Sequence, residues 1–491
     1  MDASGPELLV GFAVSANTLA PWQRDAIDAM RTVAGIDVHV VFVEGSLPPT
    51  YVEGRVSLDG FDVVIDFART SHPYATRIGT WSFQFGCDND AAFPFAREFA
   101  SGDRTIDVQL VERSGDAVSV LRTARLPASP WYPSTVRKAR SEAARWPAEL
   151  VAALRDGATL PRTPLVAHGR SAGAGRVSIA SFAVAALKRL VGSLARELVT
   201  DHVWNVGLAS GGSSALLRDE PLQIKWLDAS TSHAWIADPF VVERNGIRAV
   251  FVEQYDERRR KGHIAALVVH GDMRTIASHR AIELKTHLSY PFPLEVDGQL
   301  YLVPESAETG RVRRYRCSRF PDVWEPDETV IADIDALDTT FVQHGDLWWA
   351  FFTRASRGHD VALHAMYGPT ALGPWTAHPL NPIVLDVSCA RPAGPFFEVD
   401  GVLYRPAQDC SKTYGGAIAI ARIDELSPRA FRETIVRRIA PSASPYLDGI
   451  HTVSFLTDTI AVDGKRTVRS FTNVPRNAIG IARRVTSALL R

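Results

Sequence analysis

The sequence predicts an α/β domain at the N-terminus and an all-β, five-bladed β-propeller in the second half, with amphipathic helices at the joint and at the C-terminus. Three observations support this division. A short motif recurs about every fifty residues after residue 230, which is the spacing of propeller blades. The first seventy residues alternate strand, helix and strand patterns. A segment rich in Pro, Gly, Ser and Arg, 161–176, separates the two regions as a linker.

The N-terminal α/β domain is expected over 1–160. Apolar runs at 8–14, 38–43 and 61–67 are typical of buried strands, and Pro21 marks the first turn of a helix between the first two. This order predicts a βαβ unit and therefore a parallel sheet covered by helices. A further strand follows near residue 80, a helical segment at 93–99 and two more strands by residue 125. A single helix within 129–156 is expected to close the domain.

This domain resembles the formyltransferase fold, in its order of strands and in the segment from Ile65 through 79–86. In that family the region includes an Asn, a His and a later Asp. Here Trp81-Ser82-Phe83 occupies the place of the His stretch, and no Asn-x-His is present. The resemblance therefore implies a formyltransferase-like domain that binds a ligand or partner, or supports the propeller, without formyl transfer.

The repeat consists of a polar or aromatic residue, an apolar strand, a tight glycine turn and a second strand. Its four clear copies begin at Asp238, Tyr290, Asp338 and Arg391 and turn at Gly246, Gly298, Gly345 and Gly401. A fifth, degenerate copy begins at Asp448 and places a turn at Asp463-Gly464. The predicted propeller spans 204–470, after a linker and amphipathic helix over 161–203 and before a basic amphipathic helix over 471–491.

A propeller brings one end of every inner strand to the same mouth of its central channel. The residues at that mouth are expected to stand just before the first strand of each blade or at the end of the second. They are Asp238, Tyr290, Asp338, Arg391 and His451, followed by Glu253, Glu305, Thr353 and Gln408. A ring of carboxylates with an Arg and a His resembles a polar ligand site more than a core.

Asp238 is the sharpest catalytic candidate. Pro239 restricts the backbone and removes a competing donor, which could hold the carboxylate at the mouth. Such a carboxylate can act as general base or nucleophile at an anomeric carbon when a second acid faces it, and Glu305, Asp338 and Glu253 could each supply that acid. The alternative is that Asp238 caps a turn.

The fourth repeat adds substrate-binding candidates. Arg391, Arg405, Gln408 and Asp409 combine two guanidinium groups with an amide and a carboxylate. Guanidinium forks suit phosphate or carboxylate groups, although the arginines could instead pair with Asp409. Tyr414 and His451 could stack on a sugar or hydrogen-bond to it, or serve the structure alone.

Composition limits the function further. The chain has 491 residues, 46% hydrophobic and 22% charged, with a net charge of −1. Near-neutral charge argues against nucleic acid as a partner. The four cysteines show no metal-binding spacing and no Gly-x-Gly-x-x-Gly follows the first strand, so neither metal nor cofactor is expected.

A cytoplasmic chain is expected, because the N-terminus lacks the basic and apolar regions of a signal peptide and no uncharged stretch reaches the ~18–20 residues of a spanning helix. The amphipathic helices at 177–199 and 475–491 are basic. They could lie on the inner face of the membrane or pack across the domain joint.

The propeller resembles the five-bladed fold of the arabinanase, levansucrase and invertase group and of family 43 glycoside hydrolases, on the match of Asp238-Pro239-Phe240. It more closely resembles the N-terminal domain of plant glucosamine inositolphosphorylceramide transferases and bacterial proteins that join it to a formyltransferase-like domain. That likeness rests on segments 289–292, 303–305, 391–394 and 405–410. In the plant proteins the resemblance implies that a separate domain performs transfer.

Tyr290 and Asp338 depart from the hydrolase pattern, which expects an acid and a Glu at those places. The sequence therefore favours a glycosyltransferase in cell-envelope polysaccharide or glycolipid biosynthesis, using an activated sugar donor and a glycan or glycolipid acceptor. Asp238 would be the main catalytic carboxylate and Glu305 or Asp338 its partner. An intracellular glycoside hydrolase and a non-catalytic glycan-binding scaffold are the alternatives.

Overall fold

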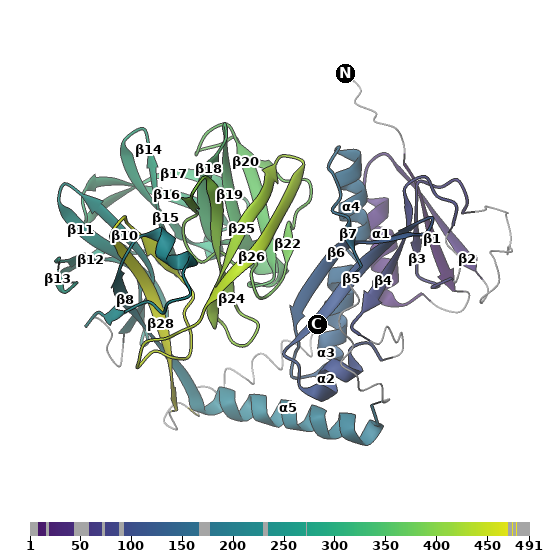
Figure 1. Ribbon diagram of the computed structural model, residues 1–491, viewed down its shortest axis with the longest axis horizontal. Coiled ribbons are helices and arrows are strands. Elements are labelled where there is room, and N and C mark those ends of the chain that lie inside the picture. The colour runs from purple at the N-terminus through teal and green to yellow at the C-terminus, as the bar shows by residue number, and fades with distance from the viewer. Residues whose placement is uncertain are drawn as a thin grey trace. The chain divides into compact units, whose positions relative to one another are not determined.

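The computed structural model describes residues 8–15, 19–43, 58–70, 74–87, 93–165, 177–228, 234–271, 273–469, 474 and 478. The chain divides into two compact units (Figure 1). The first comprises Met1–Val191 with Ser427–Ala430, and the second Gly192–Leu426 with Phe431–Arg491. The predicted C-terminal helix over 471–491 lies almost wholly outside the described residues.

The first unit is built on one seven-stranded mixed sheet. Its strands are β1 (Leu8–Ser15), β2 (Ile36–Val43), β3 (Val63–Asp66), β4 (Gly79–Phe85), β5 (Thr105–Ser114), β6 (Ala117–Pro127) and β7 (Thr163–Pro164). They lie in the order β2-β1-β3-β4-β5-β6-β7. The first four strands are mutually parallel and the rest antiparallel. The parallel half agrees with the βαβ expectation, because a helix returns the chain from β1 to β2.

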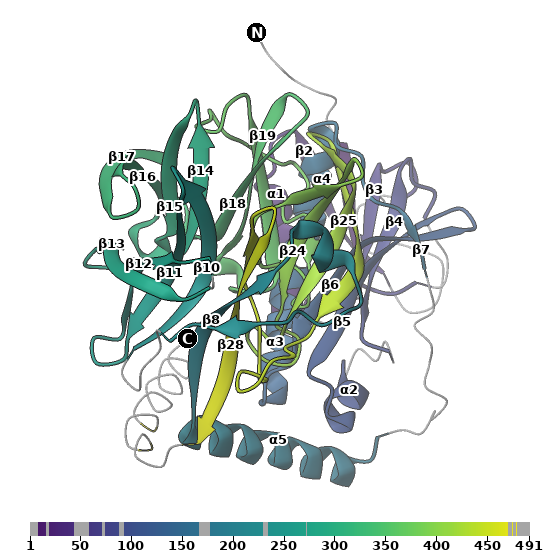
Figure 2. The ribbon, with the colours of Figure 1, turned by 60° about the vertical axis from the view of Figure 1, so that its left-hand side comes forward.

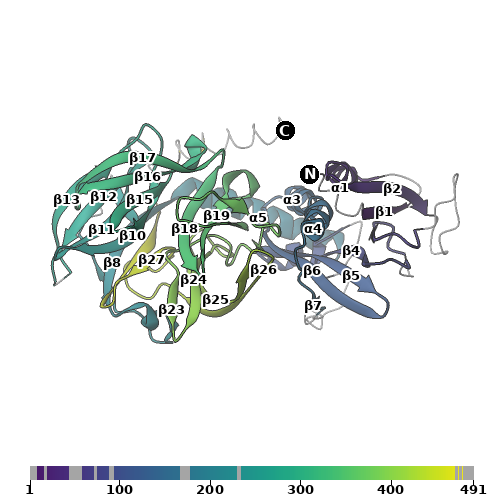
Figure 3. The ribbon, with the colours of Figure 1, turned by 90° about the horizontal axis from the view of Figure 1, so that it is seen from above.

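Helices α1 (Pro21–Arg31), α3 (Tyr132–Ala143) and α4 (Trp146–Arg155) pack together beside this sheet (Figure 3). The expectation of a single helix in 129–156 is wrong, because Pro147 lies in the first turn of α4. A proline lacks the amide hydrogen that an uninterrupted helix would use there, and its ring crowds the preceding turn. A short helix, α2 (Ala96–Ser101), and the first part of α5 (Ile179–Val199) complete the unit. Its likeness to formyltransferases stays a prediction.

The second unit is an all-β propeller of five blades, as predicted, each a sheet of four main strands (Figure 2). Blades one and two are continuous in sequence. Blade one contains β10 (Ala234–Arg244), β11 (Ile247–Asp256), β12 (Lys261–Val269) and β13 (Thr275–Ile282). Blade two contains β14 (Ser289–Val296), β15 (Gln299–Glu305), β16 (Arg311–Arg319) and β17 (Val323–Ala332).

Blades three and four repeat the pattern. Blade three contains β18 (Ala336–His344), β19 (Leu347–Arg354), β20 (Ala362–Gly368) and β21 (Thr376–Ala377), with β22 (Val384–Leu385) also paired to β20. Blade four contains β23 (Phe397–Val399), β24 (Val402–Asp409), β25 (Ala417–Ser427) and β26 (Ala430–Ile439).

Blade five joins the two ends of the propeller. Its inner strands, β27 (Val453–Phe455) and β28 (Thr459–Arg469), come from the C-terminal side, and its outer strands, β8 (Thr200–Ser210) and β9 (Lys225–Trp226), come from the N-terminal side. β28 pairs with β8 along its whole length. Because strands from both ends of the propeller pair within this one blade, their hydrogen bonds close the ring.

The predicted turn at Asp463-Gly464 is wrong, because both residues lie inside β28. The chain turns earlier, where the Leu456 amide donates to the Thr459 carbonyl. Gly464 serves close packing instead, since a Cβ atom there would lie 2.3 Å from the Trp226 ring. A glycine required for close approach has the same sequence signature as a glycine required for a turn.

Neighbouring blades share their cores. One buried cluster contains Phe240 of blade one, Phe292 of blade two and Phe341 of blade three. Blade four meets blade five through backbone, because the Val453 amide donates to the Ala393 carbonyl at 2.8 Å. Gly394 lies at this contact with φ 136°, and a Cβ atom there would lie 1.8 Å from the Val453 carbonyl oxygen.

Replacing Gly394 by Ala should therefore separate blades four and five. The hairpin Gly401, also at a positive φ (73°) but with nothing within 4 Å of an added Cβ, is the control without a close contact. We expect Gly401→Ala to lower the free energy of unfolding by about 1 kcal/mol and Gly394→Ala by about 3 kcal/mol. Denaturant unfolding measures both, and equal losses would show that the contact with Val453 is unimportant.

Candidate functional site

The first residue of the repeat adopts the same unusual backbone in three blades. Asp238, Tyr290 and Asp338 have φ angles of 52°, 43° and 53°. At each one the pairing of the first two strands of the blade shifts register, as in a β-bulge. A left-handed non-glycine residue is strained by roughly 1–2 kcal/mol, so surrounding contacts must hold it. The bulge turns each side chain out of the alternation of its strand.

Contacts across blades hold Asp238. Its Oδ2 accepts a hydrogen bond from the Tyr290 amide of blade two at 3.1 Å, and its Oδ1 accepts one from Thr452 Oγ1 of blade five at 2.7 Å. Its own amide donates to Asp463 Oδ2 at 3.2 Å. The residue is buried, and burial raises the pKa of its carboxyl group to about 6, although His451 opposes the shift. Asp238 therefore tethers three blades and titrates close to neutral pH.

His451 lies between two buried carboxylates. Its Nε2 is 3.3 Å from Asp238 Oδ1, and its Nδ1 is 2.6 Å from Asp463 Oδ2. Burial lowers the pKa of His451, but Asp463 and Asp238 outweigh burial, and the net shift is upward. The imidazole therefore holds its proton to a higher pH than a free histidine does.

These three side chains also have the spacing of a cation site, since one ligand atom of each lies within 4.8 Å of the others. Asp463 Oδ1, however, accepts the amides of His451 and Thr452. Both ring nitrogens of His451 face carboxylates. The contacts favour an ion-pair network over a metal centre.

Asp338 and Arg391 form a second cluster between blades three and four. Arg391 Nε and Nη2 lie 2.6 Å and 3.3 Å from the two Asp338 oxygens, and Nη1 lies 3.0 Å from Asp360. Gln408 Nε2 donates to Asp338 Oδ2 at 2.9 Å. The predicted second acid and the predicted arginine are therefore paired with each other.

Glu253 and Glu305 are the remaining acids of the ring. Glu305 accepts Ser289 Oγ at 2.9 Å and the Ala307 amide at 2.6 Å, and burial raises its pKa to about 7. Glu253 is buried, and burial followed by repulsion from Asp238 and Glu305 raises its pKa well above the usual value. Both carboxyl groups therefore tend to hold a proton near neutral pH.

Two tyrosines flank the carboxylates differently. Tyr290 is fully buried, and its hydroxyl group lies 2.7 Å from Thr340 Oγ1, so it packs inside the protein beneath the ring of polar residues. Tyr414 is 43% exposed, and its ring lies beside His451 and under the Arg391 guanidinium, 5.3 Å from the ring centre. Of the two, Tyr414 is the aromatic side chain that is partly exposed, and sugars commonly stack on exposed aromatic rings.

The structure does not bring Arg405 or Asp409 to the ring as free binding groups. Arg405 is fully buried inside blade four, where Nε and Nη2 pair with Glu433 at 2.9 Å and 2.6 Å. Asp409 pairs with Arg438 and accepts from Ser411. The expectation that Arg405 clamps a ligand is therefore wrong. A buried guanidinium group needs a partner inside the protein, and the hydrogen-bond donors of Arg405 are used by such a partner.

Sequence reasoning missed Thr452, Asp463 and Lys465, which blade five adds to the same cluster. Lys465 is buried, donates to Thr413 Oγ1 and to the Tyr414 carbonyl, and burial lowers its pKa to about 8. The available signal was the pair of charged residues, Asp463 and Lys465, on either side of Gly464 after an apolar run. Because a turn was expected at that position, these residues were not recognised as part of the site.

Residues 223–443 match the family model described as glucosamine inositolphosphorylceramide transferase 1, N-terminal. The rice protein of that name (Oryza sativa subsp. indica) is 30% identical over 266 residues, covering 48% of this chain and 34% of the relative. The Arabidopsis thaliana protein of that name is 29% identical over 260 residues, with the same coverage. The chain thus spans about a third of the length of these curated relatives. The family match includes Asp238, Glu305 and Asp338 and ends before His451.

Solved structures similar to the chain include a family 117 glycoside hydrolase from Zobellia galactanivorans, 14% identical with a TM-score of 0.35, covering 55% of this chain and 91% of that one. An exo-1,5-α-L-arabinanase from a bovine ruminal metagenomic library is 10% identical with a TM-score of 0.32, covering 47% and 92%.

Arg405→Leu should destabilise the propeller, because it leaves Glu433 buried without its partner. We expect a loss of about 3–5 kcal/mol in the free energy of unfolding. The double variant Arg405→Leu, Glu433→Leu removes both charges and should recover most of that loss. Thermal or denaturant unfolding measures the three proteins, and a single variant as stable as the parent would contradict a purely internal role for Arg405.

Proposed function

We propose that the chain is a carbohydrate-active enzyme, a glycosyltransferase of cell-envelope polysaccharide or glycolipid biosynthesis, with its site at the ring of polar residues in the propeller. The main support comes from two acids, Asp238 and Glu305. Both acids come from the inner hairpins of adjacent blades, and burial raises the pKa of the first to about 6 and of the second to about 7. Two carboxyl groups with different protonation near neutral pH are what acid–base chemistry at a glycosidic carbon requires.

Each acid then has a defined step. Ionised Asp238 accepts the proton of the acceptor hydroxyl group, and the oxygen of that hydroxyl group forms a bond to the anomeric carbon. Protonated Glu305 donates a proton to the leaving oxygen as the bond from that oxygen to the anomeric carbon breaks. Asp338 has a positioning role in this scheme, because it is paired with Arg391 and hydrogen-bonded to Gln408.

The ring suits an uncharged sugar better than a phosphate. Arg391 faces both Asp338 and Asp360, so it has no surplus positive charge to offer an anion. Paired charged groups are strong partners for hydroxyl groups. We therefore infer that Arg391 and Gln408 position the sugar, and that Tyr414 stacks against it.

The names of the plant relatives favour transfer from an activated donor to a glycan or glycolipid acceptor. Hydrolysis is the second candidate function, because the same acid pair would act equally on a glycoside with water as acceptor. A glycan-binding scaffold is the third.

We also propose that the protein works in the cytoplasm, against the inner face of the membrane. Helix α5 (Ile179–Val199) leaves Ile179, Val184, Leu187 and Val191 exposed along one side, with the exposed Lys188 at the edge of this stripe. Its other side packs on the first unit, where Phe182 contacts Phe99 and Tyr132. An apolar stripe with a basic group at its edge suits an anionic membrane surface. Within the described part of the chain, no helix has the length and apolarity needed to cross a membrane.

The catalytic proposal predicts that Asp238→Asn keeps the fold and lowers turnover by about 10²–10⁴-fold, because the variant preserves the volume and removes the base. Glu305→Gln should give a similar loss. Activity should be highest between about pH 6 and pH 7. Asp238 loses its charge as the pH falls through its pKa, and Glu305 loses its proton as the pH rises through its own.

The assays would pair nucleotide-activated and phospho-activated sugars with a lipid or oligosaccharide acceptor, beside aryl-glycosides in water. Asp409→Asn, a change of the same type in an acid paired away from the ring, is the matched control. Faster release of free sugar from aryl-glycosides than any transfer would favour hydrolysis. Full activity in Asp238→Asn would exclude both enzymes at this ring and leave the scaffold.

For the membrane contact, Leu187→Glu should weaken co-sedimentation with phosphatidylglycerol vesicles by about tenfold, since one buried leucine contributes roughly 1.5–3 kcal/mol. Leu187 and Ile276 are each 63% exposed, and Ile276 belongs to β13 of blade one, not to α5. Ile276→Glu is therefore the matched control and should bind vesicles as the parent does. Parent protein that fails to bind these vesicles would refute the contact.

A further inference from the structure

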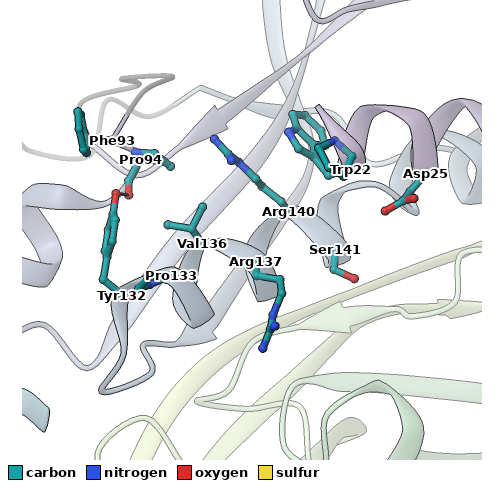
Figure 4. A pocket seen from close by; sticks show the side chains of 11 residues that line it. Trp22, Asp25, Phe93, Pro94, Tyr132, Pro133, Val136, Arg137, Arg140 and Ser141 are labelled. Carbon is teal, nitrogen blue, oxygen red and sulfur yellow. Dashed lines mark hydrogen bonds between the residues drawn. The ribbon is translucent and has the colours of Figure 1, made fainter. Parts of the chain in front are cut away.

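The first unit contains a pocket of about 690 Å³ that the proposed propeller chemistry does not use. It lies between the start of α1, the start of α3 and the segment that precedes α2 (Figure 4). Its walls are mainly apolar, and its lining includes Trp22, Phe93, Pro94, Tyr132, Pro133 and Val136. The volume falls within the ~300–1,000 Å³ typical of small-molecule sites.

A smaller cavity of about 160 Å³ adjoins this pocket and shares Trp22, Pro94 and Arg140 with it. Its lining adds Asp66, Phe67, Phe83 and Phe85. The ring of Trp22 packs edge-on against the three phenylalanines. One face of the combined space is therefore an aromatic surface.

The position of the smaller cavity in the sheet is informative. Asp66 is the last residue of β3, and α1 follows the carboxyl end of β1. The connection after β1 leads to β2 on one side of the β1–β3 pair, and the connection after β3 leads to β4 on the other side, so the direction of winding changes between β1 and β3. Open α/β sheets bind ligands outside the carboxyl ends of their strands at such a switch point.

Asp66 has an unused acceptor at this point. The residue is only 5% exposed. Its Oδ2 accepts the amide and the hydroxyl group of Thr70, both at 2.9 Å. Among the described residues no donor reaches Oδ1, which is buried. Burial raises the pKa of this carboxyl group, although hydrogen bonds from Thr70 and from the backbone amides of Arg69 and Ala68 oppose the shift. A buried oxygen without a donor is costly, and a ligand that supplied one would remove the cost.

Arg140 supplies the opposite charge from α3. In Figure 4 its guanidinium group extends between Pro94 and Trp22, whereas Arg137 points away from both. Arg140 lines both cavities, and burial lowers its pKa. An anion beside this group would reverse the effect of burial and gain a charge-assisted hydrogen bond.

We propose that this double cavity binds a small molecule with a flat heteroaromatic ring, an N–H donor on that ring and a phosphate or carboxylate group. The ring stacks on Trp22 within the aromatic surface. The N–H group donates to Asp66 Oδ1, and the anionic group accepts from Arg140. This site is independent of the propeller ring and involves no chemical step.

Binding to the full-length protein would be measured by isothermal titration calorimetry with two sets of probes. AMP, GMP, CMP and UMP test the phosphate form, and indole-3-acetate tests the carboxylate form. We expect saturable binding of at least one probe, weakened about tenfold or more by Asp66→Asn and by Arg140→Gln. Asp28→Asn on the exposed face of α1 and Arg145→Gln outside both cavities are the matched controls and should bind as the parent does.

The competing role for Asp66 and Arg140 is purely structural, and thermal unfolding separates the two roles. A ligand site predicts that Asp66→Asn unfolds at the same temperature as the parent or higher, while losing the probe. Absence of saturable binding of all five probes up to about 5 mM, a weak affinity even for a fragment, would overturn the proposal. Binding that is equally strong in Asp66→Asn, Arg140→Gln and parent would overturn it as well.

Discussion

The geometry of the ring depends on the left-handed bulge at the start of the inner strands. A propeller blade left to strict strand alternation would direct its first polar residue along the sheet face, toward the neighbouring blade. The bulges at Asp238, Tyr290 and Asp338 place these side chains at the inner ends of their strands, where five blades meet. The strain is offset by hydrogen bonds to the neighbouring blades, so the same contacts fix the backbone and orient the carboxylates.

This dual use explains why the ring acids differ in role although they occupy equivalent positions. Asp338 meets Arg391 and is neutralised by a cation, whereas Asp238 meets a tyrosine amide, a threonine hydroxyl group and a histidine shared with Asp463. Burial then dominates the titration of Asp238 and raises its pKa to about 6. The neighbours supplied by the adjacent blades therefore decide whether a repeated acid is paired with a cation, as Asp338 is, or has its pKa raised by burial, as Asp238 has.

The sequence predicted the five blades and most of this ring, because a period of about fifty residues maps directly onto blade geometry. It could not predict the pairing of Arg391 with Asp338, or of Arg405 with Glu433, since pairs far apart in sequence leave no local pattern. Asp463 and Lys465 were hidden for a related reason. Gly464, which lies between them, is inside β28 because the Trp226 ring packs too close to it for a side chain. From one sequence, a glycine needed for such close packing cannot be distinguished from a glycine needed for a turn.

The charge balance of the ring bears on the choice between transfer and hydrolysis. Arg391 is shared by two carboxylates, and His451 lies between two more, so within the described residues each of these two cations is already paired. A donor with a phosphate leaving group would have to bring a counter-charge or place its phosphate beside Lys465, whose pKa of about 8 leaves it mostly protonated at neutral pH. Lys465 lies in β28 of blade five, beyond the last residue of the family match. The choice between a phosphate-activated donor and a plain glycoside therefore depends on Lys465, a residue that the family match does not reach.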